Sequence, residues 1–62
     1  MRDIAKRLRD ARGDIPRKEV CKALGLATST LTMYETGQRV PRDEIKIALA
    51  NFYKTTVEAL FY

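Results

Sequence analysis

The chain has 62 residues, enough for one small domain near the lower limit at which a single hydrophobic core is self-supporting. One cysteine and no histidine exclude an intrachain disulfide framework and metal sites of the Cys/His kind, so we expect neither a metal nor a cofactor. The hydrophobic content of 45% predicts a folded chain, and the net charge of +4 favours an anionic partner.

The first predicted helix spans residues 2–12. Its apolar residues fall at i, i+1, i+4 and i+7, which places them on one helical stripe: Ile4, Ala5, Leu8 and Ala11. The basic residues of the segment lie on the other side. Gly13 then provides a stop, because a residue without a Cβ takes the left-handed conformation at little cost.

A second helix is predicted to restart at Asp14-Ile15-Pro16 and to end before Gly25. We expect Asp14 to cap its free amides, and proline is tolerated in a first turn. The inward stripe consists of Val20, Cys21 and Leu24. Arg17 and Lys18 lie outside, at the end where two cations oppose the helix dipole. A nearby phosphate would reverse that cost, although the two residues can also be read as ordinary solvated charges.

The third predicted helix, residues 28–36, lies between Gly25 and Gly37. Placing its residues 100° apart gives an inward arc with Leu31 and Tyr34, and an opposite arc with no charge. That opposite arc consists of Thr28, Ser29, Thr32, Met33 and Thr36. Exposed helices normally carry lysine and glutamate, whereas small uncharged polar groups suit the major groove of DNA. The alternative is that these hydroxyl groups are merely solvated.

The loop at residues 37–42 contains Arg39 and Arg42 and no acid, a composition suited to a backbone phosphate. A fourth helix is predicted over residues 43–53, apolar around more than half of its circumference. Thr56 is expected to cap a last short helix. The predicted fold class is therefore all-α, a compact bundle of five short helices with a helix-turn-helix formed by the second and third. Residues 1–62 are expected to be a single domain.

Several residues at fixed spacing resemble the lambda-repressor-like (Cro/Xre-type) helix-turn-helix family over nearly the whole chain. They are Val20-Cys21, Leu24-Gly25-Leu26-Ala27, Tyr34-Glu35, Gly37, Pro41, Leu49-Ala50 and the ending Thr56-Val57-Glu58-Ala59-Leu60-Phe61. Three features depart from the family pattern. The link between the first two helices is about two residues short, Arg17 replaces a common DNA-contacting glutamine, and Pro16 and Ala27 replace hydroxyl caps.

The resemblance implies a role for each group of residues. It assigns base-edge contacts to Thr28, Ser29, Thr32 and Met33. It assigns phosphate contacts to Arg17, Lys18, Gln38, Arg39 and Arg42. Family members often pair the acid at the position of Glu35 with an arginine of the first helix, so a structural ion pair between Arg12 and Glu35 is expected.

The leading interpretation is a sequence-specific transcriptional regulator of double-stranded DNA, a phage-type or small bacterial repressor in the cytoplasm. One small domain covers about one half-site, so we expect a homodimer, formed through the fourth and fifth helices, on a palindromic operator. Those apolar faces can equally complete a thin core. Neither a membrane nor a small-molecule substrate is expected as a partner.

A second interpretation is a protein-interaction module, resembling an antitoxin or antirepressor, in which DNA binding is secondary or lost. The modest charge and the uncharged face of the third helix favour it. Binding that resists salt would support this reading, since phosphate contacts weaken steeply with salt. An enzyme is the least supported class, because no serine, cysteine or carboxylate has an evident base beside it.

Overall fold

The computed structural model describes residues 3–62, and these residues form five α-helices and no strand, which confirms the predicted all-α class. The helices are α1 (Ile4–Arg12), α2 (Arg17–Leu24), α3 (Thr28–Glu35), α4 (Asp43–Phe52) and α5 (Val57–Phe61). The predicted bounds differ by about one residue for α3 and α4. Residue 2, where the first helix was expected to begin, lies outside the described residues.

Side-chain caps fix the beginnings of two helices. The Oδ1 atom of Asp3 accepts from the amide of Lys6 at 2.9 Å at the start of α1, and Thr56 Oγ1 accepts from the amide of Ala59 at 3.1 Å in α5, as predicted. The prediction that Asp14 caps α2 is wrong. Pro16 holds the cap position and offers no side-chain acceptor, so Asp14 lies two residues too early to reach the free amides.

Four helices are followed by a residue with positive φ, and after α1 this residue is Gly13, with φ 54°. Gly25 has φ 70° after α2 and Gly37 has φ 80° after α3, both as expected for glycine. Lys54 takes the same conformation after α4 with φ 56°. Its amide donates to the carbonyl of Asn51 at 3.2 Å, and the amide of Thr55 donates to that of Ala50 at 2.9 Å, which is a Schellman ending without glycine.

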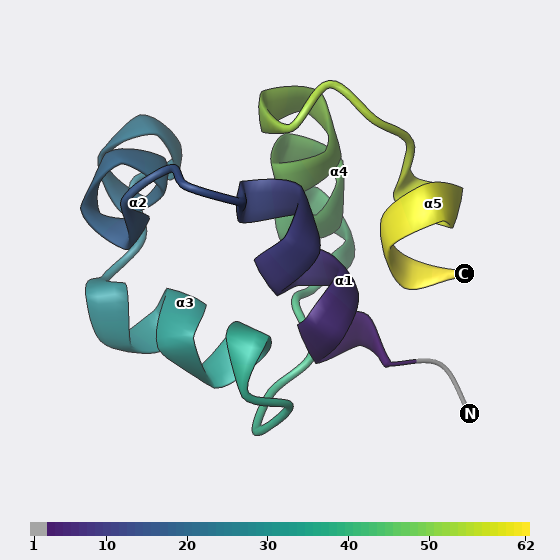
Figure 1. The fold of residues 1–62 in the computed structure, drawn as a ribbon, viewed down its shortest axis with the longest axis horizontal. Coiled ribbons are helices and arrows are strands. Elements are labelled where there is room, and N and C mark those ends of the chain that lie inside the picture. Colours follow the sequence, from purple (N-terminus) through teal and green to yellow (C-terminus); the bar gives the residue numbers. More distant parts are fainter. Residues whose placement is uncertain (1–2) are drawn as a thin grey trace.

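Helix α3 contributes only one of its sides to the hydrophobic core. Figure 1 shows α2 and α3 together at one end of the molecule and α5 at the other, with α1 and α4 between them. Contributions come from every helix: Leu8, Val20, Cys21, Leu31, Tyr34, Leu49, Ala50, Leu60 and Phe61. Helix α3 packs against α1 and α2. Its inner residues, Leu31 and Tyr34, are buried as predicted, which leaves the opposite side of the helix free.

Candidate DNA-binding face

The outer side of α3 bears the uncharged residues that the sequence analysis singled out. Thr28 and Ser29 are exposed in the first turn, and Thr32 and Met33 are half-buried one turn later. The one charged residue of this helix, Glu35, has no exposed surface. The exposed side of α3 is therefore free of charge over its whole length.

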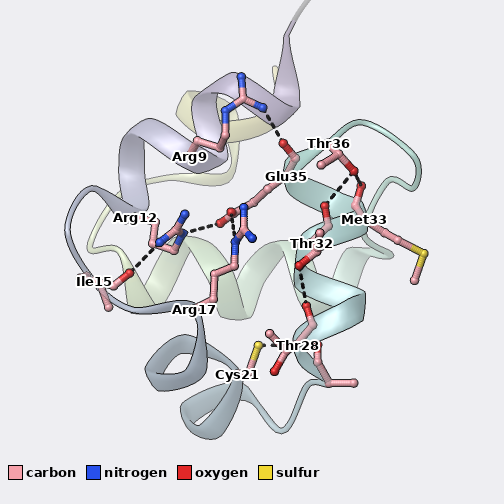
Figure 2. A network of polar contacts seen from close by, with 11 residues as sticks. Arg9, Arg12, Ile15, Arg17, Cys21, Thr28, Thr32, Met33, Glu35 and Thr36 are labelled. Atoms are coloured by element: carbon pink, nitrogen blue, oxygen red, sulfur yellow. Dashed lines mark hydrogen bonds and ion pairs between the residues drawn. The ribbon is translucent and has the colours of Figure 1, made fainter.

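Two of the hydroxyl groups on this face donate hydrogen bonds to the helix backbone. Thr32 Oγ1 donates to the carbonyl of Thr28 at 2.9 Å, and Thr36 Oγ1 donates to the carbonyl of Thr32 at 2.9 Å (Figure 2). Because a hydroxyl has one proton, each of these oxygens is left as an acceptor, with its methyl group held in one rotamer. Thr32 is thus equipped to accept from a base amino group or to contact a thymine methyl group, rather than to donate.

Exposed polar side chains, three of them cations, lie on two segments next to α3 in the chain: the first turn of α2 and the loop after α3. Lys18 is exposed in the first turn of α2, and Gln38, Arg39 and Arg42 are exposed between α3 and α4. None of these four side chains has a hydrogen-bond or ion-pair partner within residues 3–62. Pro41 is buried and restricts the backbone of the loop after α3. The side chains of Arg39 and Arg42 in this loop are exposed to solvent.

Arginine side chains enclose the carboxylate of Glu35. Arg12 Nε donates to Oε2 at 2.7 Å, which is the pair that the family resemblance implied. Arg17 Nε donates to the other oxygen, Oε1, at 2.8 Å. Figure 2 shows the two guanidinium groups meeting this one carboxylate, while Arg9 donates to the backbone carbonyl of Glu35. The last turn of α3 is therefore tied to both α1 and α2.

Arg17 is the residue whose surroundings differ from the expectation. Arg17 was expected either to contact a phosphate or to be an ordinary solvated charge, whereas its Nε is bound to a buried acid 18 positions away. No periodic pattern reveals a contact across that distance. The available signals were the excess of arginine around a single inward acid and the replacement of the family's glutamine.

The cluster alters the acid–base behaviour of its neighbours. The hydrogen bond to Glu35 raises the pKa of Arg12, an effect that burial partly opposes. Burial, followed by the charge of Glu35, raises the pKa of Tyr53 to about 12. The Tyr53 hydroxyl is enclosed and has no hydrogen-bond partner among the described residues. A buried carboxylate paired with two arginines therefore lies near a tyrosine hydroxyl that has no hydrogen-bond partner among the described residues.

Two packed helices joined by the short turn at residues 25–27, the second with an uncharged outer face, define a helix-turn-helix domain of the DNA-binding class. The chain belongs to the helix-turn-helix domain family, whose model matches residues 3–60. The match agrees with the resemblance to Cro/Xre-type domains. Comparison with curated proteins and with solved structures finds no match.

No helix in residues 3–62 is long and apolar enough to cross a membrane. The same residues contain no group of three or more histidine, cysteine, aspartate or glutamate side chains placed to hold a metal ion.

Proposed function

We propose that this protein is a sequence-specific transcriptional regulator of double-stranded DNA, acting as a small bacterial or phage repressor. The observation that carries the proposal is the uncharged outer side of α3, together with exposed cations on α2 and on the loop after α3 that have no partner in the described chain. In this proposal α3 enters the major groove. The base-reading residues are Thr28, Ser29, Thr32 and Met33.

The proposed phosphate contacts come from two segments, the first turn of α2 and the loop after α3. Lys18 grips the backbone beside the start of α2, and Gln38, Arg39 and Arg42 grip it from the loop after α3. Arg17, also in the first turn of α2, contacts phosphate together with Lys18. Contacts of this kind fix the register of α3 on the duplex without reading sequence. Occupancy of a promoter would then exclude polymerase, and a DNA partner implies a cytoplasmic location.

Residues 1–62 act in this proposal as one domain, and a second copy supplies the other half-site. Ile47 of α4 and Tyr62 after α5 are 54% and 53% exposed, large values for apolar or aromatic side chains. They line a shallow groove together with Asp43, Lys46 and Val57. One acid and one base in a single patch suit a two-fold contact, in which each copy offers both charges. This arrangement supports a homodimer through α4 and α5 on a palindromic operator.

Selection of bound duplexes from a random pool, with the purified chain at moderate salt, tests the proposal. The expected result is one enriched site with two-fold symmetry and half-sites about one helical turn apart. Binding to that site should weaken with salt at a log–log slope of about −0.9 per contacted phosphate. Failure to enrich any sequence, with the chain folded, would reject sequence-specific binding.

The exposed Ile47 and Tyr62 also favour a second candidate, a protein-interaction module of the antitoxin or antirepressor kind. In that case the apolar groove binds a different protein and α3 contributes little. Substituting Ile47 with serine separates the two functions. Loss of a protein partner with unchanged affinity for duplex DNA would support the second candidate.

A further inference from the structure

Arg17 and Arg12 bind the same carboxylate but differ in their exposure. The Arg12 side chain is 18% exposed, and its Nη1 also donates to the carbonyl of Ile15 at 2.8 Å. The Arg17 side chain is 36% exposed. Its terminal amino groups have no partner among residues 3–62. Arg17 therefore has one side bound to Glu35 and one side available to a ligand.

The charge of the cluster leaves Arg17 in excess. Glu35 carries one negative charge, which the more deeply placed Arg12 already balances. Arg17 adds a second positive charge at the first residue of α2, where the helix dipole is unfavourable to a cation. The amides of this turn have no side-chain cap either. An anion beside Arg17 would offset both the excess charge and the dipole.

We propose that Arg17 is a positioning residue that bridges a DNA backbone phosphate to Glu35. In the complex, Nε keeps its bond to Glu35 Oε1 and the terminal amino groups donate to the phosphate. A guanidinium is planar and has five N–H donors in a fixed fork, so both contacts can be made at once. Because Glu35 ends α3, the bridge ties the orientation of the reading helix to the position of one phosphate. The inference rests on the proposed function.

The first experiment compares the salt dependence of DNA binding in two variants that each lose one partner of Glu35. Arg17→Met, which has no hydrogen-bond donor, should weaken binding about tenfold and reduce the log–log salt slope by about 0.9, the value for one phosphate. Arg12→Met should lower thermal stability but leave the slope unchanged. Equal slopes for wild type and Arg17→Met would overturn the bridge.

A second variant tests positioning separately from charge. Arg17→Lys keeps a cation for the phosphate, but an ammonium lacks the planar fork needed to hold both groups. The salt slope should therefore be retained. The ratio of affinities for the selected and a scrambled duplex should fall about threefold or more, at the lower end of couplings between contacting residues. An unchanged ratio would mean that Arg17 provides charge alone.

Nitrogen NMR of the arginine side chains provides a readout independent of mutant folding. On addition of the selected duplex, the Arg17 Nε–H signal should stay protected from exchange while its terminal amino signals shift. Loss of protection at Nε would show that the side chain leaves Glu35, which contradicts the bridge. Wild type that binds no duplex at all rejects the proposed function instead, so the two failures are distinguishable.

Discussion

Arg12 Nε and Glu35 Oε2 lie 2.7 Å apart although 23 positions separate them in the chain. The pair joins the last residue of α1 to the last residue of α3. Glu35 has no exposed surface, so its charge depends entirely on arginine donors for the solvation that water would otherwise provide. Helix α3 is thus fixed at its C-terminal end by ion pairs and along its inner side by the burial of Leu31.

Glu35→Gln should destabilise the fold strongly. The substitution removes the acid that pairs with Arg12 and Arg17, and leaves two cations close together with no counter-ion among residues 3–62. Removal of one partner from a buried ion pair typically costs about 3–5 kcal/mol. Thermal and urea unfolding measure the loss. Asp10→Asn is the matched control, because the Lys6–Asp10 pair is about two-thirds exposed on both sides and should contribute less than about 1 kcal/mol. Similar losses of unfolding free energy for the two variants would contradict a stabilising role for the ion pairs of Glu35.

The sequence was informative wherever a feature depends on neighbours in the chain. Glycine at residues 25 and 37 and the 3.6-residue period located α2 and α3, since helix ends and stripes are local properties. The two wrong or missing details are of another kind. Asp14 is a residue type that often caps helices, but α2 begins two residues too late for Asp14 to cap it. The first residue of a helix depends on how the apolar side chains that follow pack into the core. The bond between Arg17 and Glu35 depends on tertiary packing, which no local pattern encodes.

Lys54→Gly should stabilise the protein. Lys54 has φ 56° at the end of α4, in the role that Gly37 fills after α3. A lysine there carries a left-handed strain of roughly 1 kcal/mol that glycine avoids, although glycine gives back part of the gain as entropy of the unfolded chain. The expected net gain is about 0.5 kcal/mol, a rise of a few degrees in the melting temperature. The reverse change, Gly37→Ala, should cost about 1 kcal/mol. A fall in melting temperature for Lys54→Gly would show that the left-handed backbone at Lys54 is not strained.

Tyr53→Phe should remove part of the alkaline loss of stability. The pKa of Tyr53 is raised from its ordinary 10.0 to about 12 in the fold, so the unfolded chain loses this proton first. The unfolded state is then favoured progressively as pH rises, and the stability that the neutral phenol preserves below pH 10 is lost between pH 10 and 12. Lysine titration contributes to both proteins and cancels in their difference. The free energy of unfolding of Tyr53→Phe relative to wild type should therefore increase across that window.

The same variant has an expected result at pH 7. The Tyr53 hydroxyl is enclosed without a partner in the described chain, so its removal deletes an unsatisfied group and should leave stability unchanged or slightly raised. A loss above about 1 kcal/mol would indicate that the hydroxyl is hydrogen-bonded in solution. Urea unfolding at pH 7, 10 and 11.5 covers both results in one series.

Thr32→Val should change base preference at one or two positions of the selected site. Valine keeps the methyl group but removes the oxygen that is left as an acceptor when the hydroxyl donates to Thr28. A base that donates to Thr32 through its amino group should lose its advantage, by about 1–3 kcal/mol of discrimination at most. Thr36→Val is the control, because it deletes an equivalent hydroxyl bond one turn further along. Identical preference profiles for Thr32→Val and wild type would remove Thr32 from the reading face.

Arg39→Ala should weaken binding to all duplexes by a similar factor. Arg39 is exposed in the loop after α3, and the proposed contact is to a phosphate, which is the same for every sequence. The salt slope should fall by about 1, while the ratio of affinities for selected and scrambled duplexes stays constant. This pattern is the opposite of that expected for Thr32→Val, where the ratio changes and the slope does not. Fluorescence anisotropy titrations of both variants at three salt concentrations compare them directly. If Arg39→Ala erased the preference for the selected site and left nonspecific affinity intact, Arg39 would be a base reader.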